Sequence, residues 1–100
     1  SKENSANKMN YYSLSSKKQD RNMETYIVNL NACEGENQLS SHEGEEFMYV
    51  LEGEIEVRYG KDVHVLGKGD TIYYDSIVPH LVLPRTPEGA KLLAVVYVPF

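Results

Sequence analysis

The sequence predicts a single all-β domain built from short antiparallel strands. From residue 24 onward, stretches rich in β-branched and aromatic side chains recur about every ten residues, separated by Gly, Pro, Asn or Asp. No window shows apolar side chains at the i, i+3, i+4 spacing of an amphipathic helix. One hundred residues suffice for one core, and 41% apolar with 25% charged residues is ordinary for a globular protein. These observations favour an antiparallel sandwich or barrel.

The N-terminal part of the chain changes character near residue 11. Residues 1–10 contain almost no apolar side chains, so we expect a flexible tail or linker remnant there and a folded domain over 11–100. Tyr11 and Tyr12 are possible anchors at the start of a charged loop. The first clear strand pattern is ETYIVNL at 24–30, and turn residues in NACEGENQ end it.

The next two strand patterns are interpreted as a β-hairpin. From Phe47 to Leu51 the side chains are apolar on both faces, so this strand is expected to be buried on both sides. Gly53 marks a turn, and EIEVRY at 54–59 then alternates cleanly. One face carries Ile55, Val57 and Tyr59, and the solvated face carries Glu54, Glu56 and Arg58.

Four shorter patterns complete the predicted fold. Their sequences are VHVL at 63–66, TIYY at 71–74, HLVL at 80–83 and KLLAVVYV at 91–98. His64 lies between two valines and is expected to be exposed. Alternation leaves open whether Ile72 and Tyr74 or Thr71 and Tyr73 face the interior.

Charge and composition argue against two classes of partner. The net charge is −5 and the basic residues are scattered, so we expect no direct nucleic-acid binding by this chain. The longest apolar run, LLAVVYV at 92–98, is too short to span a bilayer, so no membrane partner is expected. The N-terminus shows no export signal, and the single Cys33 has no partner for an internal disulfide. We therefore expect a cytoplasmic protein.

One stretch, SSHEGEEFMYVLEGEIEV at 40–57, combines one histidine with six glutamates. His42 and Glu46 are four residues apart, so they share a face of an extended strand unless Gly44 inserts a bulge. His80 begins a later strand, and two imidazoles with one carboxylate are the ligands of the facial triad that holds Fe(II) or similar ions. The alternative is that both histidines are polar rim residues and Glu46 caps a loop. Spacing alone does not decide between the two.

The order of these residues resembles the cupin family. The first cupin motif reads G-x5-H-x-H-x3/4-E-x6-G, and SSHEGEEFMYVLEG aligns His42, Glu46 and Gly53 with its second histidine, its glutamate and its closing glycine. The resemblance covers about residues 24–98, with the motif region at 40–84. It implies a jelly-roll β-barrel with a pocket in the barrel mouth.

The second cupin motif reads G-x5-P-x-G-x2-H-x3-N, and GDTIYYDSIVPHLVLP aligns Gly69 and His80 with its first glycine and its histidine. The motif's proline, glycine and asparagine are replaced by Asp75, Ile77 and Pro84. Ser40 stands where the first motif has its first histidine. A cupin metal is usually held by three histidines and the glutamate, and this chain keeps two of those histidines. The resemblance thus implies His42, Glu46 and His80 as metal ligands, with Mn, Fe, Ni or Zn as the possible cofactor.

A narrower resemblance is to the C-terminal cupin sensor domains of helix-turn-helix transcription regulators. It implies that an unknown small molecule enters the barrel and changes an attached DNA-binding domain, which lies outside these residues. The expected ligand pocket comprises His42, Glu46, Met48, Tyr74 and His80. The alternative is a metal-dependent cupin enzyme, such as an oxygenase or isomerase, using the same two histidines and Glu46. Because Ser40 removes one ligand, we favour the binding module.

Cupins commonly pair, so the resemblance also implies a homodimer. Strands such as 24–30 or 91–98 could extend a sheet across two subunits.

Overall fold

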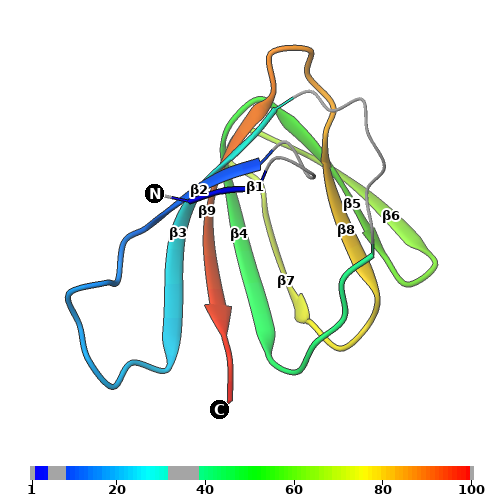
Figure 1. The fold of residues 1–100 in the computed structure, drawn as a ribbon. Helices are drawn as coiled ribbons and strands as arrows, with labels where there is room; N and C mark the ends of the chain where they lie inside the picture. Colours follow the sequence, from blue (N-terminus) through cyan, green and yellow to red (C-terminus); the bar gives the residue numbers. More distant parts are fainter. Residues whose placement is uncertain (1, 5–8, 32–38, 100) are drawn as a thin grey trace.

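The computed structural model describes residues 2–4, 9–31 and 39–99, and within these ranges every regular element is a β-strand (Figure 1). The strands are β1 (Lys2–Asn4), β2 (Met9–Ser13), β3 (Met23–Leu30), β4 (Glu45–Glu52), β5 (Glu54–Tyr59), β6 (Asp62–Gly67), β7 (Thr71–Asp75), β8 (His80–Pro84) and β9 (Ala90–Tyr97). The predicted strands from residue 24 onward coincide with β3 to β9 to within two residues at each end. The all-β prediction is therefore confirmed. Cys33 lies outside the described residues.

The strands form two antiparallel sheets. One has the order β1-β2-β3-β9-β4-β7 and the other the order β6-β5-β8. Because β4 and β5, and again β7 and β8, follow each other in the chain but lie in different sheets, the chain crosses repeatedly between the two layers (Figure 1). The predicted hairpin around Gly53 is therefore wrong: β4 pairs with β7 and β9, and β5 pairs with β6 and β8. Crossing between two layers is the arrangement expected of a jelly-roll barrel, and the predicted fold class is confirmed.

The core lies between the two sheets. Its most deeply buried side chains come from both layers: Val50 and Leu92 from the larger sheet, Ile55 and Val57 from the smaller. On β5 the predicted alternation is confirmed, because Ile55 and Val57 are buried and Arg58 is exposed. Burying these apolar side chains is the main source of the free energy that holds the sheets together.

On β4 only one face is buried. Glu46, Met48 and Val50 point into the barrel, whereas the side chain of Tyr49 is 38% exposed and its neighbours on that face are half-buried. The prediction that this strand is buried on both sides is therefore wrong. The physical reason is that no layer of described residues covers the outer face of the six-stranded sheet.

The register settles which face of the 71–74 strand is internal. Glu46 pairs with Tyr74 and Met48 with Ile72, and directly paired residues lie on the same face of a sheet. Tyr74 is buried and Tyr73 is exposed. The face carrying Ile72 and Tyr74 is thus the inner one.

Part of the segment expected to be a tail adds strands to the larger sheet. Lys2–Asn4 pairs with Met9–Tyr11, and β2 pairs in turn with β3 along its full length. Pairing uses backbone N–H and C=O groups, so even a polar sequence can occupy a sheet edge.

The prediction that strand 24–30 or 91–98 extends a sheet across two subunits is wrong. β3 lies between β2 and β9, and β9 lies between β3 and β4, so neither 24–30 nor 91–98 offers a free edge to a second subunit. Among the described strands, the sheet edges are β1, β7, β6 and β8.

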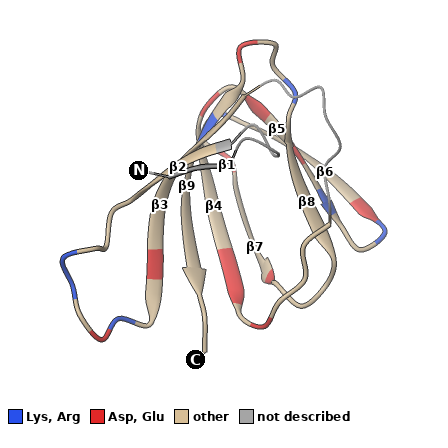
Figure 2. Cartoon of the chain, viewed as in Figure 1, with Lys and Arg blue, Asp and Glu red and all other residues tan. Residues whose placement is uncertain are grey.

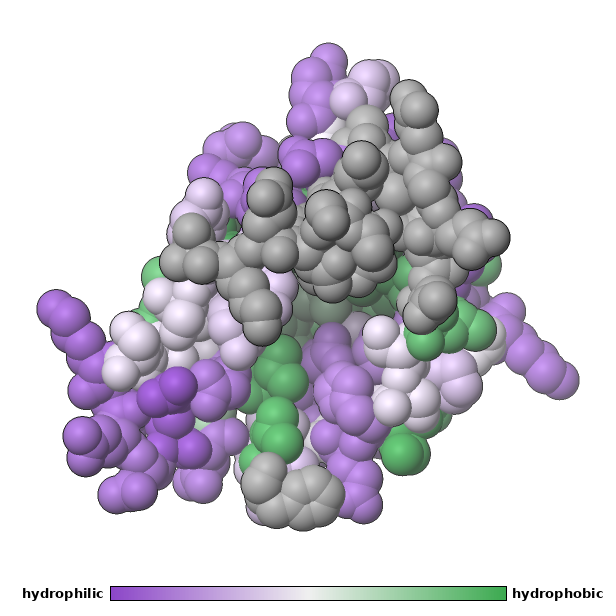
Figure 3. All heavy atoms as spheres, viewed as in Figure 1, coloured by the Kyte–Doolittle hydropathy of each residue, from purple (hydrophilic) through white to green (hydrophobic). Residues whose placement is uncertain are grey.

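Charge and hydropathy are distributed unevenly over the molecule. Figure 2 shows acidic residues at the start of β4 and basic residues in the loop before β3. Figure 3 shows hydrophobic surface near the middle of the face that it presents, between more hydrophilic peripheral segments. The described residues contain no helix of a length and apolarity that would cross a membrane.

Candidate functional site

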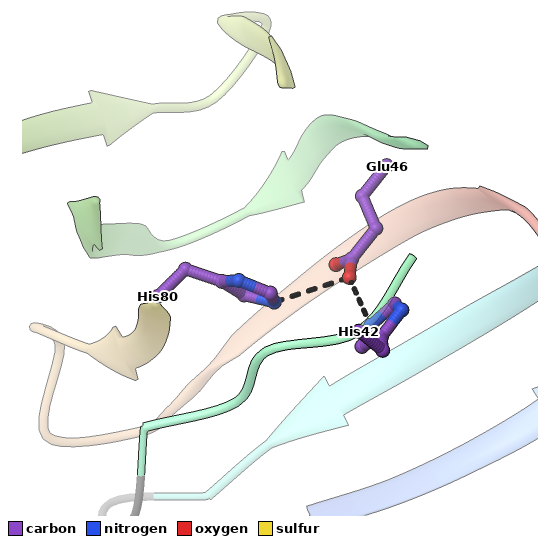
Figure 4. Close-up of side chains that lie close together, drawn as sticks. All are labelled: His42, Glu46 and His80. Carbon is purple, nitrogen blue, oxygen red and sulfur yellow. Dashed lines mark ion pairs between the residues drawn. The ribbon is translucent and has the colours of Figure 1, made fainter. Parts of the chain in front are cut away.

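Three side chains from two distant parts of the sequence, His42 with Glu46 and His80, lie close together (Figure 4). Glu46 is the second residue of β4, His42 precedes that strand, and His80 is the first residue of β8 in the other sheet. Backbone hydrogen bonds align the segments that carry them. Ser40 and His80 exchange two, at 2.8 and 2.9 Å, and the His42 amide donates to the carbonyl of Ser76 at 3.1 Å. The segment before β4 therefore runs beside the start of β8.

Gly44 turns the chain between His42 and Glu46. Its φ of 120° is one that L side chains rarely adopt, and a Cβ there would collide with the backbone carbonyl of Tyr97. β4 begins only at Glu45, so His42 lies outside the strand. The two side chains meet because of this turn, and the alternation of a continuous strand does not account for their proximity.

The three side chains converge on one carboxylate oxygen. His42 Nε2 lies 2.8 Å and His80 Nε2 3.1 Å from Glu46 Oε2. All three ligand atoms lie within 4.8 Å of one another. The His80 and Glu46 side chains are only 5% and 11% exposed, whereas that of His42 is 44% exposed. The cluster is therefore buried on one side and accessible from the His42 side.

Backbone carbonyls set the orientation of both imidazole rings. His42 Nδ1 lies 3.1 Å from the carbonyl oxygen of Glu43, and His80 Nδ1 lies 2.8 Å from that of Val78. A carbonyl can only accept, so Nδ1 carries the proton in each hydrogen bond. In a neutral ring, Nε2 then presents a lone pair to the Glu46 carboxylate, which is also an acceptor. Protonation of the rings or a bound cation resolves this clash of acceptors.

Two hydroxyl groups donate hydrogen bonds to the Glu46 carboxylate. The Tyr74 hydroxyl donates to Oε1 at 3.1 Å, and the Ser76 hydroxyl donates to Oε2 at 3.0 Å. Ser76 is fully buried. Burial, followed by the negative charge of Glu46, raises the pKa of Tyr74, so its phenol stays protonated and remains a donor. Glu46 is thus fixed in position whether or not the histidines contact it.

The cluster opens into a cavity of about 430 Å³ between the two sheets. Among the described residues, four polar ones line it: Ser40, His42, Glu46 and His80. The other described lining residues are apolar or aromatic: Tyr11, Tyr26, Val28, Leu30, Met48, Leu81, Val82, Leu92, Ala94 and Val96. A mostly apolar cavity with a few convergent polar groups is the usual form of a small-molecule site.

The expected pocket residues divide into two groups. His42, Glu46, Met48 and His80 line the cavity, whereas Tyr74 lies behind Glu46 and reaches the site only through its hydrogen bond to that carboxylate. Ser40, which stands at the missing motif histidine, also lines the cavity.

The sequence did not identify most of the apolar residues that line the cavity, among them Tyr11 and Tyr26, nor Ser76 as a partner of Glu46. Tyr11 and Tyr26 line the cavity with their rings packed edge to face at 5.4 Å, and Ser76 supports Glu46. Alternation within 24–30 could have identified Tyr26, because it shares a face with the buried Val28. Ser76 lies between two strands and has no periodicity that would reveal it.

The remaining acidic and imidazole groups lie elsewhere. His64 is exposed on β6, as expected. Glu56 belongs to an ion-pair network on the outer face of the smaller sheet, where Arg58 and Arg85 donate to it. The hydrogen bond from Arg58 holds the pKa of Glu56 below its usual value. Only 15% of the Glu56 side chain is exposed, whereas those of Glu54 and Arg58 on the same face are 47% and 52% exposed.

The donor set fits a divalent transition metal. Ligand bonds of about 2.1 Å at right angles would place neighbouring donor atoms ~3.0 Å apart, and the two contacts to Glu46 Oε2 are 2.8 and 3.1 Å. The Nδ1 contacts direct both Nε2 lone pairs inward, as ligating histidines require. A metal held by three protein ligands keeps positions open for an exogenous molecule, and it would supply Lewis acidity there.

Two groups among the similar proteins of known structure bear on function. An HTH_3 family transcriptional regulator from Vibrio cholerae is 26% identical with a TM-score of 0.80, over 96% of this chain and 54% of that protein. The Cupin_2 domain of an XRE family transcriptional regulator from Enterobacter cloacae is 17% identical with a TM-score of 0.78, over 93% and 99% of the respective chains. The latter likeness shows the fold alone.

The second group is HppE. Its cobalt(II) form in complex with Tris is 28% identical with a TM-score of 0.76, over 89% of this chain and 53% of that one. Its iron(II) form is 27% identical with the same TM-score, over 89% and 50%. This chain therefore spans about half the length of HppE and of the Vibrio regulator.

No curated protein matches the sequence. The family model described as a cupin domain matches residues 26–96. This match covers most of the chain, including both motifs and all three members of the cluster, and it confirms the resemblance seen in the sequence. The chain belongs to the cupin family.

Proposed function

We propose that this chain is the small-molecule-binding module of a helix-turn-helix transcription regulator. The observation that carries the proposal is the cavity of about 430 Å³, which is apolar over most of its wall and ends at a compact polar cluster. The similarity to the Vibrio regulator, of which this chain spans about half, supports the regulatory role. Ligand binding in the cavity would change the DNA affinity of a helix-turn-helix domain elsewhere in the protein.

The proposed pocket comprises His42, Glu46, Met48 and His80, with Tyr74 as a positioning residue behind Glu46. The two histidines and Glu46 hold a divalent transition metal: Mn, Fe, Ni or Zn. Ser40 contributes no imidazole, so three protein ligands leave several coordination positions to the small molecule. The pairing of a fixed carboxylate with two oriented imidazoles supports this assignment.

The proposal includes a homodimer in the cytoplasm. Helix-turn-helix proteins read two half-sites with a two-fold symmetric dimer, and cytoplasmic DNA is their target in bacteria. This chain itself makes no DNA contact, because its net charge is −5.

Metal and ligand binding can be tested together on the purified chain. Apo protein is titrated with Co(II) and the visible absorption of the bound ion is followed. One equivalent is expected to bind to wild type, and His42→Ala and His80→Ala are expected to reduce the affinity at least tenfold. His64→Ala is the matched control, since His64 is exposed on β6 and should leave binding unchanged. Unchanged Co(II) affinity in both cluster variants would reject the metal site.

A metal-dependent enzyme is the second candidate, and the likeness to the cobalt(II) and iron(II) forms of HppE favours it. Mass spectrometry of a bound compound, after incubation with the metal-loaded protein in air, separates the two functions. An enzyme converts the compound over many turnovers, and Glu46→Gln abolishes the conversion. A sensor returns the compound unchanged, and the compound alters the DNA affinity of the full-length regulator in a gel-shift assay.

A further inference from the structure

We propose that the ligand of this cavity is an amphipathic monoanion, a small organic acid with one oxyanion head group and an apolar tail. The head group binds at the cluster of His42, Glu46 and His80, and the tail lies along the inner face of the six-stranded sheet toward Tyr11 and Tyr26. The inference rests on the proposed function, because the head group requires the proposed metal as its partner.

The charge of the head group follows from the groups that line the cavity. Glu46 is the one carboxylate among the described lining residues, and none of these residues is a lysine or an arginine. With a divalent ion and one carboxylate, the cluster carries a net charge of +1. A monoanion neutralises this charge, whereas a dianion leaves a negative charge without a partner in an apolar enclosure.

The apolar character of the tail follows from the strand register on the inner face of the six-stranded sheet. One row beyond Glu46, the inward side chains of β4, β9 and β3 are Met48, Ala94 and Tyr26. The following row contains Leu92. Every inward residue in these two rows that lines the cavity is apolar or aromatic, so the polarity of the wall falls sharply with distance from Glu46. Such a wall favours a hydrocarbon or aryl tail and disfavours additional polar groups.

The volume limits the size of the ligand. At the ~30 Å³ that a water-sized group occupies in a liquid, a cavity of about 430 Å³ has room for about 14 non-hydrogen atoms. A linear carboxylate of about twelve carbons has that number of atoms. Methylene groups beyond this length would lie in solvent and would add no affinity.

The test uses straight-chain carboxylates from butanoate to tetradecanoate as probes of the Co(II)-loaded chain, with calorimetry as the measurement. We expect the affinity to rise about fourfold per added methylene, which corresponds to ~0.8 kcal/mol. The rise should end near twelve carbons, so that tetradecanoate binds no tighter than dodecanoate. Octanedioate should bind at least tenfold more weakly than octanoate, because its second carboxylate would enter the apolar end.

A variant that fills the tail region sharpens the test. Ala94→Phe should weaken decanoate binding at least tenfold and butanoate binding much less, because Ala94 lies on β9 one row beyond Glu46, where the tail runs. Co(II) uptake should stay at one equivalent, since Ala94 is not a ligand of the ion. If Ala94→Phe does not fold, Val82→Phe on the opposite wall serves the same purpose.

Three results have distinct meanings. Equal affinity for butanoate and decanoate on the Co(II)-loaded chain overturns the apolar tail. Equal affinity for octanoate with and without Co(II) overturns the metal-bound head group. Either result leaves the metal site of the proposed function intact, whereas failure of the chain to take up Co(II) overturns the metal site and this inference together.

Discussion

The hydroxyl group of Tyr74 offers a sharp test of how the candidate site is built. Tyr74→Phe removes one oxygen atom from a buried ring and leaves the Oε1 atom of Glu46 without its donor. Hydrogen bonds to charged groups contribute about 1.5–3 kcal/mol. The separation of 3.1 Å is long for a hydroxyl donor, and Glu46 keeps its bond from Ser76, so the lower part of this range applies. We expect a loss of ~1.5–2 kcal/mol in the free energy of unfolding.

For a domain of this size, that loss lowers the melting temperature by about 6–16 °C, at ~4–8 °C per kcal/mol. Urea unfolding measures the loss in free energy directly, and circular dichroism is the signal because the chain contains no tryptophan for fluorescence. Tyr59→Phe is the matched control. Its hydroxyl donates to the carbonyl of Asp75 at 3.2 Å in an exposed setting, so its removal should cost ~0.5 kcal/mol.

A double-mutant cycle identifies the partner. In a Glu46→Gln background, Tyr74→Phe should cost at least about 1 kcal/mol less than in wild type, because the acceptor no longer carries a charge. Equal costs in the two backgrounds, or equal costs for Tyr74→Phe and Tyr59→Phe, would refute the reasoning that the phenol supports the Glu46 carboxylate.

Three further predictions concern other parts of the molecule. Gly44→Ala should lower the free energy of unfolding by about 1–3 kcal/mol through backbone strain, and it should also weaken Co(II) binding. The control is Gly69→Ala, where φ is 88° and the surrounding space is open, so only the stability should fall. Equal Co(II) affinity in the two variants would contradict the role assigned to the Gly44 turn. The pKa of Glu56 is lowered in the folded state, so its contribution to stability is present above the unfolded pKa and is lost as the pH falls through the folded pKa. Urea midpoints of Glu56→Gln should therefore converge with those of wild type on acidification, and a pH-independent difference would count against the ion pairs. Ser40→His should tighten Co(II) binding in calorimetry by supplying a fourth ligand beside His80, and weaker binding would show that the backbone at Ser40 directs its side chain elsewhere.

Alternating side chains and turn residues were sufficient to predict most of the fold. Clusters of β-branched and aromatic residues bounded by Gly and Pro located β3 to β9, and on β5 the alternation also separated the inner face from the outer one. These patterns could not locate β1 and β2, whose pairing depends on backbone hydrogen bonds that polar side chains do not reveal. They also misjudged β4, because Phe47 and Tyr49 are apolar without being deeply buried.

The residue types of the candidate site could be predicted from the sequence, but the contacts that position them could not. His42, Glu46 and His80 could be selected from residue type and spacing, and the structure brings them together. The turn at Gly44 depends on a close approach to Tyr97, 53 residues further along the chain, and the support from Ser76 bridges 30 residues. No local pattern encodes such contacts, so they require the three-dimensional structure.

The cluster could also couple the two sheets, because its members belong to different layers. Glu46 sits in the six-stranded sheet, and His80 begins a strand of the three-stranded sheet. An ion coordinated by both would act as a cross-link between the layers at the open end of the barrel. Amide hydrogen exchange at the start of β4 and at the start of β8 would then slow together on loading. Occupancy of a site only a few ångströms wide could in this way be transmitted as stiffness to the whole domain.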